Sequence, residues 1–330
     1  MKRFFIFAVV LLSCWLCAGK LFAASPEVET ARQNGAQGQI TLRVVDSTGK
    51  PVEKAELSVA FWASDSSANA VVSEGKTDTN GYYVAAGKTI HSMNYTITKD
   101  GYYKTTGEYW FYRRGEDCVK NGRWQPWNTT NTAVLKEHRN PTAMYVKYVD
   151  EPVPVRDVPV GFDLEVGDWV APYGKGKRPD LFFTYKAKVQ DFWNGSLELI
   201  IACTNKMDGF FRVQKDMGSD FRSAYEAPTS GYQLEVRFAF VTTTDRDVKV
   251  EKLGDTEYLV LRVQTVLDDK GNIVSARYGK IYGPIEFGVG KEHHIRFSYY
   301  FNPTANDRNI EFDLSRDLLE NPGRVRVNMP

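Results

Sequence analysis

The sequence is poor in cysteine, and this excludes a disulfide-stapled fold. Of its four cysteines, Cys14 and Cys17 lie within the first 24 residues, which leaves Cys118 and Cys203. Two cysteines in so long a chain do not make a disulfide framework, so the fold must depend on its hydrophobic cores. The sequence leaves open whether Cys118 and Cys203 pair in an oxidising compartment or stay as buried thiols.

The chain also has no excess of charge of either sign. Its 42 Lys and Arg residues against 41 Asp and Glu give a net charge of +1. A nucleic-acid-binding surface needs a strongly basic face or stripe, because the phosphate backbone dominates the affinity. We therefore predict no nucleic-acid partner.

Histidine is scarce as well, and none of the four residues falls in a metal-binding spacing. His293 and His294 are consecutive in a strand-like stretch, so their side chains point to opposite faces, while His91 and His138 lie alone. Zinc sites need three or four converging ligands, and serine hydrolases need a nucleophile elbow that is missing here. We predict no metal, no cofactor and no catalytic residue that can be named from the sequence.

Residues 1–24 have the pattern of a secretory signal peptide. Lys2 and Arg3 precede an apolar run over residues 4–12, and small residues follow up to a cleavage position after Ala23 or Ala24. The run is shorter than the ~20 apolar residues of a spanning helix. We predict export to the periplasm or the extracellular space, with no transmembrane segment in the mature chain. The alternative is a lipoprotein with lipid on Cys14, but the bulky Leu12 is unusual before such a cysteine.

Alternating apolar and polar residues predict an all-β chain. Residues 25–38 show no period and are predicted to be a short flexible leader. Residues 40–46 and 55–62 then alternate, with Leu57, Val59 and Phe61 on the inward side. Several further short segments with the same character, separated by turn residues, indicate a small β-sandwich over residues 39–139.

Two turn motifs in this region raise the question of calcium. Asp78-Thr79-Asn80-Gly81 begins like an EF-hand loop, but the twelfth position is Thr89 where such a loop needs a glutamate. Asp can accept hydrogen bonds from the following backbone, and Asn-Gly accepts a positive φ. We therefore predict hairpin turns here and at Lys99-Asp100-Gly101.

Four blocks of this region resemble a known family in their order. They are Gly49-Lys50-Pro51-Val52, then Ala55 with Leu57 and Val59, then residues 77–82, then residues 95–102. Together they resemble the carboxypeptidase regulatory-like domain, a transthyretin-like sandwich that occurs as an accessory module in many secreted bacterial proteins. The resemblance covers about residues 38–115. It implies a structural or binding role and no catalytic residue.

Residues 140–330 form a second predicted domain, which begins at the turn-forming pair Asn140-Pro141. Its strand-like segments are not interleaved with amphipathic helices, so a doubly wound sheet is not expected. Residues 268–272, with the sequence Asp-Asp-Lys-Gly-Asn, predict a hairpin turn between two of these segments. We predict a second, larger antiparallel β-sandwich or jelly-roll-like domain of unknown function.

Aromatic side chains supply the candidate ligand-binding residues. Tyr102 and Tyr103 are neighbours in one strand-like stretch, Trp110 lies in the next, and Trp124 and Trp127 lie in a predicted loop over residues 113–131. Exposed aromatic faces can stack on sugar rings while their polar tips stay in water. The alternative is ordinary sheet surface, because aromatic residues are enriched in strands.

These features predict an exported, non-catalytic binding or structural protein of the cell envelope, with a carbohydrate or an envelope protein as partner. The alternative function is a carbohydrate-active hydrolase, which needs two carboxylates facing each other in the second domain. The eligible residues are Asp163, Glu165, Asp168, Asp180 and Asp191. A third possibility is a purely structural assembly subunit.

Overall fold

The computed structural model describes residues 25–64, 70–189, 194–242, 248–288, 294–320, 327, 329 and 330. The predicted signal peptide, with Cys14, lies outside the described residues. The chain divides into two compact units, and each is described by itself. The first contains the chain up to Val45, Lys50–Thr98 and Thr106–Ala133, and the second contains Asp46–Gly49, Lys99–Thr105 and the chain from Val134 onward. The described regular structure is one short helix and many strands, which confirms the predicted all-β class.

Helix α1 (Pro26–Asn34) occupies most of the segment that we expected to be a flexible leader, so that expectation was wrong. Ser25 caps its first turn by accepting a hydrogen bond from the Val28 N–H, and Pro26 is a favourable first helical residue. Only Val28 and Ala31 are buried. Two apolar positions are too few to show a helical period in the sequence, which is why the pattern did not predict the helix.

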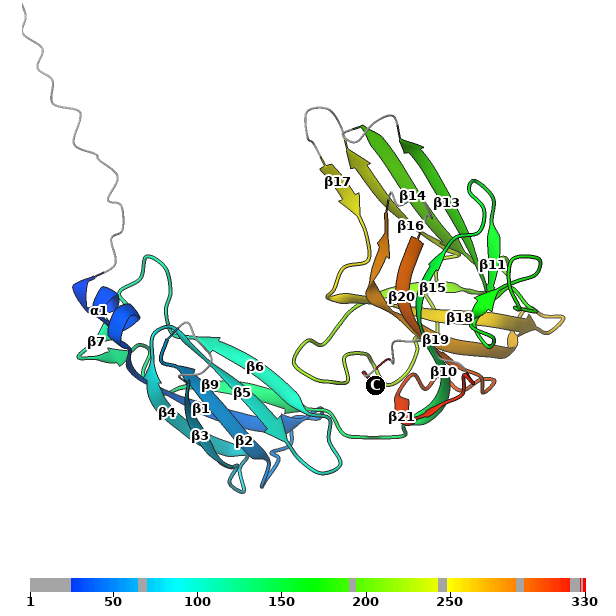
Figure 1. The fold of residues 1–330 in the computed structure, drawn as a ribbon. Coiled ribbons are helices and arrows are strands. Elements are labelled where there is room, and N and C mark those ends of the chain that lie inside the picture. Colours follow the sequence, from blue (N-terminus) through cyan, green and yellow to red (C-terminus); the bar gives the residue numbers. More distant parts are fainter. Residues whose placement is uncertain are drawn as a thin grey trace, which may run out of the picture. The chain divides into compact units, whose positions relative to one another are not determined.

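The first unit contains a five-stranded and a four-stranded sheet (Figure 1). The first sheet consists of β1 (Ala36–Asp46), β4 (Tyr82–Thr89), β7 (Val119–Lys120), β8 (Arg123–Trp124) and β9 (Thr129–Leu135). The second has the order β3-β2-β5-β6 and consists of β2 (Glu56–Trp62), β3 (Ala70–Lys76), β5 (Ser92–Thr98) and β6 (Thr105–Trp110). The alternation predicted for β2 is confirmed, because Leu57, Val59 and Phe61 are buried and the residues between them are not.

The two predicted hairpin turns have the expected chemistry but different connections. Asp78 Oδ1 accepts the N–H groups of Asn80 at 2.9 Å and Tyr82 at 2.8 Å, and Gly81 has φ +78°. This turn joins β3 to β4, which belong to different sheets, so the predicted hairpin is wrong there. Gly101, with φ +80°, lies between β5 and β6, which are neighbours in one sheet, and that hairpin prediction is confirmed.

The second unit contains two six-stranded sheets. One has the order β15-β18-β19-β20-β10-β21 and consists of β10 (Thr142–Pro152), β15 (Gly209–Gln214), β18 (Glu257–Leu267), β19 (Ile273–Phe287), β20 (His294–Asn302) and β21 (Phe312–Asp317). The other has the order β12-β11-β13-β14-β16-β17 and consists of β11 (Val160–Asp163), β12 (Asp168–Trp169), β13 (Leu181–Val189), β14 (Gly195–Ala202), β16 (Glu235–Thr242) and β17 (Val248–Glu251). Neighbouring strands are antiparallel except β10 and β21.

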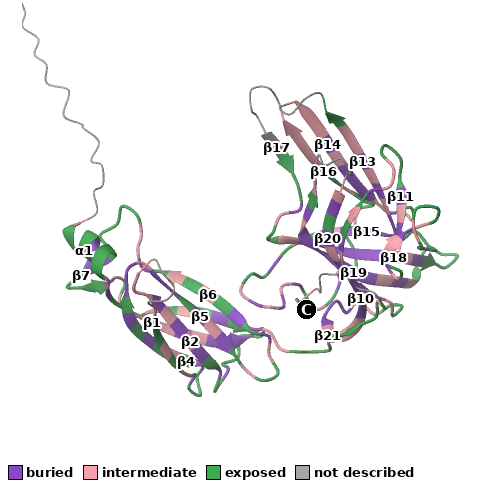
Figure 2. Cartoon of the chain, viewed as in Figure 1, coloured by how far each residue is buried: buried purple, intermediate pink, exposed green. Residues whose placement is uncertain are grey.

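The main core of the second unit lies between these sheets. Phe183 and Leu199 from one sheet and Leu259 and Phe297 from the other belong to a single buried cluster. The opposite face of the β18–β19 region is buried too, in a second cluster that includes Tyr258 and other tyrosines. β18 is therefore buried continuously from residue 258 to residue 263 (Figure 2), and a strand covered on both faces is typically a continuous apolar run.

Three further predictions can be compared with the structure. Asp268 Oδ1 accepts the N–H groups of Lys270 and Asn272 between the neighbouring strands β18 and β19, which confirms the predicted hairpin. Cys118 and Cys203 are both buried and free. Among the described residues, no helix combines the length and the apolar character that crossing a membrane requires.

Candidate functional site

The structure does not gather the five predicted ligand-binding residues on one surface. Tyr103 is buried, and its hydroxyl donates a hydrogen bond of 2.8 Å to Glu311 Oε1. Burial and this carboxylate raise the pKa of Tyr103. Tyr102 is half-buried and donates to Glu137 Oε1 at 3.2 Å. Both tyrosines belong to the second unit and serve mainly to anchor their own segment.

Trp124 and Trp127 differ in exposure although they lie close in the sequence. Trp124 is fully buried, and its indole N–H donates to the Thr89 carbonyl at 2.8 Å. It belongs to the short strand β8, where we had predicted a loop, so its ring is core and is not available for stacking on a ligand. Trp127 is partly exposed, and the Arg123 guanidinium lies 4.9 Å from its ring centroid.

Trp110 is the most exposed of the five predicted residues. Its side chain is 50% exposed at the end of β6, yet its ring does not hang free. It stacks on His91, with 5.1 Å between centroids and 24° between planes. His91 Nδ1 lies 2.8 Å from Ser92 Oγ, which donates to Glu108 Oε1 at 3.3 Å. The stack on His91 therefore fixes the orientation of this exposed indole.

A second tryptophan lies on the same outer face. Phe61 of β2 points into the core opposite Met93 of β5, so the next residue, Trp62, points outward. Trp62 Nε1 donates to Asn94 Oδ1 at 3.3 Å, which orients its ring along the sheet surface. Because β2 and β6 both pair with β5, two strand spacings of ~5 Å separate the backbones of the two tryptophans.

We call this surface the Trp62–Trp110 face and define it as Trp62, His91, Asn94, Glu108 and Trp110. It combines two indole rings with an amide, a carboxylate and an imidazole, all from the sheet β3-β2-β5-β6 and the turn before β5. Trp62 and His91 were not among the site residues predicted from the sequence. The alternation of β2 would have predicted that Trp62 lies on the surface, because Phe61 points inward and the next side chain of a strand points to the opposite face.

The carboxylates proposed for a hydrolase are mostly committed to backbone groups. Asp163 is buried, and its two oxygens accept four backbone N–H groups, from Glu165, Val166, Lys177 and Arg178, at 2.8 to 3.1 Å. Asp168 accepts the Lys175 N–H at 2.8 Å. These two residues hold loops in place. Glu165 is paired with Arg178 at 2.7 Å, and Asp191 lies outside the described residues.

Asp180 lines a polar pocket of about 330 Å³ in the second unit, together with Asp208. Asp180 Oδ2 accepts the Leu164 N–H at 2.9 Å, and its Oδ1 accepts the Gln264 side-chain amide at 2.8 Å. Burial raises the pKa of Asp180, and burial likewise raises the pKa of Asp208. Both residues are more than nine-tenths buried, so little of either one is open to the pocket.

A β-bulge shapes this pocket. Val263 pairs with Arg277 and Val266 pairs with Ser275, so Gln264 and Thr265 face a single residue of β19. Gln264 has φ +57°, a left-handed conformation that costs a non-glycine residue about 1 to 2 kcal/mol. The bulge turns the Gln264 side chain toward Asp180.

Asp208 stabilises the bulge from the loop between β14 and β15. Its Oδ2 accepts the Gln264 N–H and its Oδ1 accepts the Thr265 N–H, both at 3.0 Å. The carboxylate thus satisfies the two amides that the bulge removes from the ladder.

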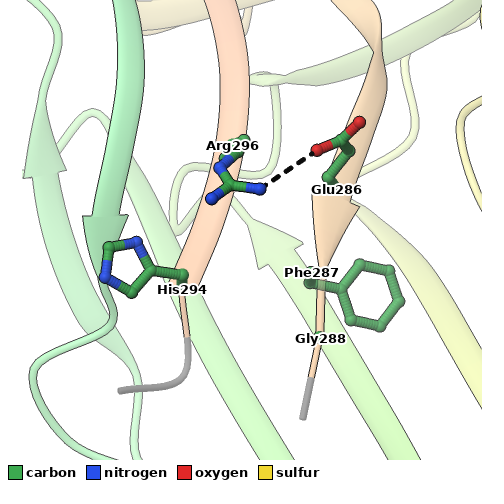
Figure 3. Close-up of a pocket in the computed structure, with 5 residues that line it drawn as sticks. All are labelled: Glu286, Phe287, Gly288, His294 and Arg296. Carbon is green, nitrogen blue, oxygen red and sulfur yellow. Dashed lines mark ion pairs between the residues drawn. The ribbon is translucent and has the colours of Figure 1, made fainter. Parts of the chain in front are cut away.

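Another hollow lies at the end of β19 and the start of β20 (Figure 3) and is lined by Glu286, Phe287, Gly288, His294 and Arg296. Arg296 lies 3.6 Å from Glu286, and Asp150 lies 3.0 Å from both Arg296 and His294. Burial acts to raise the pKa of Asp150, but hydrogen bonds from Arg296 and His294 outweigh it and lower the pKa. These groups are solvent-exposed, and exposed ion pairs contribute little to stability.

A lysine is buried on the tyrosine-rich face of β19. Lys280 Nζ donates to Ser223 Oγ at 3.0 Å and lies 4.8 to 5.1 Å from the ring centroids of Phe221, Tyr282 and Tyr300. Burial lowers its pKa well below the usual value, although Glu311 acts in the opposite direction. The side chain is fully buried, so it does not contact a ligand in solution.

Comparisons with known proteins give no family. No family model matches the chain, and no curated protein matches it. The chain is similar to a 3-chlorocatechol 1,2-dioxygenase from Rhodococcus opacus 1CP, at 15% identity over 32% of this chain and 61% of that chain, with a TM-score of 0.25. It thus matches less than two thirds of the dioxygenase.

Two pilins match over more of the chain. The shaft pilin SpaA from Lactobacillus rhamnosus GG is 13% identical over 74% of this chain and 93% of that chain, with a TM-score of 0.21. BcpA, the major pilin subunit of Bacillus cereus, is 11% identical over 83% of this chain and 99% of that chain, with a TM-score of 0.22. Similarity at these identities and TM-scores does not indicate a shared function. The resemblance of the first unit to the carboxypeptidase regulatory-like domain therefore stays a prediction.

Proposed function

We propose that this protein is an exported, non-catalytic carbohydrate-binding protein of the cell envelope whose ligand lies on the Trp62–Trp110 face. The observation that carries the proposal is the half-exposed Trp110 indole held in a fixed orientation by His91. An exposed aromatic ring that is already ordered loses little entropy when a ligand stacks on it. In this proposal the first unit is the regulatory-like accessory module, and residues 1–24 direct export.

The chemistry of the face suits a sugar chain. The apolar C–H face of a sugar ring packs against an indole, and the hydroxyls at its edge need hydrogen-bond donors and acceptors close by. Asn94 and Glu108 supply such groups beside the rings. The two tryptophans come from strands on either side of β5, so an extended ligand of more than one sugar unit laid across β5 can contact both indoles.

The arrangement of the acidic residues supports binding over hydrolysis. A glycosidase needs a general acid and a second carboxylate on opposite sides of the scissile bond. In the second unit Asp163, Asp168, Asp180 and Asp208 accept backbone N–H groups, which engage these carboxylates in holding loops and the bulge. The Trp62–Trp110 face as defined contains one carboxylate, Glu108, whereas hydrolysis requires two.

A glycan array screened with the mature protein tests the proposal. We expect binding to a defined subset of oligosaccharides, and loss of that binding in Trp110→Ala. Tyr82→Ala is the matched control, because Tyr82 is an exposed aromatic residue of β4, in the other sheet of the same unit. Release of reducing ends from a bound glycan would contradict the non-catalytic part, and equal binding by both variants would contradict the site.

A further inference from the structure

The outer face of the sheet β3-β2-β5-β6 continues along β2 beyond the Trp62–Trp110 face. Side chains of a strand alternate between its two faces, so Ala60 and Ser58 point to the same side as Trp62. All three are half-buried, whereas Val59 and Phe61 between them belong to the core. Because alanine and serine are small, the surface of β2 is low over these two positions.

Larger side chains of the neighbouring strands stand on both sides of this low stretch. The alanine lies between Val72 of β3 and Asn94 of β5. The serine lies between Glu74 of β3 and Thr96 of β5. The two flanking strands are two strand spacings, or about 10 Å, apart. We call this surface the β2 trough and define it as Ala60, Ser58, Val72, Glu74, Asn94 and Thr96.

A polar hollow of about 430 Å³ lies in the trough at the end away from Trp62. Its lining includes Ser58, Glu74 and Thr96 of the trough, and Glu56, Lys76 and Thr98 one row further along the same three strands. The strand rises about 3.3 Å per residue, so the six residues from Glu56 to Trp62 extend for about 20 Å. A ligand that occupies this whole length is therefore elongated.

The polar groups of the hollow are accessible to a ligand. Thr98 is exposed and Thr96 is half-buried, and within the part of the chain that the structure describes neither side-chain hydroxyl has a hydrogen-bond partner. Ser58 Oγ donates to Glu74 Oε1 at 3.5 Å, a long hydrogen bond that leaves the exposed carboxylate able to accept others. Each hydroxyl of a sugar both donates and accepts, so it matches these groups.

Acidic groups outnumber basic groups along this surface. Among the described residues that line the hollow, Glu56 and Glu74 are acidic and Lys76 is basic. Lys76 Nζ lies 2.9 Å from Glu56 Oε1, so its charge is already balanced. Glu108 adds a further carboxylate on the Trp62–Trp110 face. The surface therefore keeps an excess of negative charge, which repels an anionic ligand, most strongly at low salt.

We propose that the β2 trough extends the binding site and takes a linear, non-acidic glycan that runs from the tryptophans to the hollow. This inference rests on the proposed function and adds to it the length and the charge of the ligand. The trough is one strand wide, which suits a chain without branches. A short chain at the indoles would leave the hydroxyl groups of the hollow unused, so affinity should grow with chain length.

Isothermal titration with short and long chains of the same sugar tests the trough. The probes are cellobiose, xylobiose, mannobiose and chitobiose, and the hexasaccharide of each series. In at least one series we expect the hexasaccharide to bind about tenfold more tightly than the disaccharide, or better. Ser58→Leu should remove this gain, because the larger side chain fills the floor of the trough. Ala86→Leu is the control, since it places a leucine on the exposed face of β4 in the other sheet, and the gain should remain.

A second variant removes polar groups without filling the trough. Thr96→Val/Thr98→Val replaces the two hydroxyls by methyl groups of similar size, and valine is favourable in a strand. We expect its affinity for the hexasaccharide to fall about tenfold and its affinity for the disaccharide to stay the same. A urea midpoint equal to that of the unmodified protein shows that this variant, like Ser58→Leu, is folded.

The outcomes separate the trough from the Trp62–Trp110 face. Equal affinities for disaccharide and hexasaccharide, or a length gain that survives in both trough variants, would overturn the trough and leave the aromatic face in place. No binding of any probe would overturn both. Hexagalacturonate tests the charge, because it carries a carboxylate on every ring. We expect it not to bind, and binding as tight as that of the best hexasaccharide would contradict a non-acidic ligand.

Discussion

Trp110 and His91 stack with 5.1 Å between ring centroids, and this contact holds an indole in place that is half exposed to solvent. Stacked aromatic pairs contribute about 0.5 to 1.5 kcal/mol beyond the area that they bury. The stack on His91 therefore orders the Trp110 side chain in the free protein, so a ligand does not have to order it on binding.

Replacing the supporting ring should weaken binding without removing the ring that binds. For His91→Ala we expect glycan affinity to fall roughly two- to tenfold, in proportion to the stacking energy. Isothermal titration measures the change. His138→Ala is the control, since His138 packs on Tyr103 in the second unit, and its affinity should not change. A His91→Ala protein with unaltered affinity would show that the stack is not needed.

The carboxylate that holds the bulge should be important for stability. In Asp208→Ala the N–H groups of Gln264 and Thr265 lose their acceptor, and we expect the free energy of unfolding to fall by about 1 to 3 kcal/mol. Asp220→Ala is the comparison, because it removes an exposed pair with Lys104 and should cost less than about 0.5 kcal/mol. Urea denaturation measures the loss of unfolding free energy in both variants, and similar losses would show that Asp208 does not stabilise the bulge.

The buried Lys280 should make stability depend on pH. Burial lowers the pKa of Lys280 in the folded protein well below 10.5, so between these two values the unfolded chain binds more protons. The free energy of unfolding should therefore rise as pH increases through that window, by at most about 1.4 kcal/mol per pH unit. From pH 7 to pH 9 the urea midpoint of the unmodified protein should therefore rise relative to that of Lys280→Met, which lacks the titrating group. Parallel changes would mean that Lys280 titrates normally.

Two glycines with similar φ angles provide a test of the turns. Gly101→Ala meets no atom within 4 Å and should cost about 1 to 2 kcal/mol for the left-handed conformation alone. The Cβ atom of Gly81→Ala would lie 2.4 Å from the Val44 carbonyl oxygen, so we expect a further loss of about 1 to 3 kcal/mol. Thermal unfolding of the two variants gives the difference, and equal melting temperatures would contradict this explanation.

The strands could be predicted where one face is buried and the other is not. Leu57, Val59 and Phe61 show this pattern and lie where it placed them. β3 could not be found in this way, because Val71 and Val72 are both exposed and give no alternation. Helix α1 is too short to show its own period.

The sites were harder to predict than the strands. Sequence could not tell that Trp124 is core while Trp127 is on the surface, because both follow turn residues in a segment without a period. The pocket joins Asp180, Asp208, Thr265 and Arg277, which lie far apart in the chain and meet only through the sheet pairings and one bulge. The pairing of two strands fixes such a site, and no local pattern records it.

Isothermal titration of the mature protein with cello-, manno-, xylo- and chito-oligosaccharides measures whether the Trp62–Trp110 face binds a glycan. We expect measurable binding to at least one series, affinity reduced about tenfold or more in Trp110→Ala and Trp62→Ala, and affinity unchanged in Tyr82→Ala. Affinity that is the same in all three variants would contradict the claim that the Trp62–Trp110 face is the binding site.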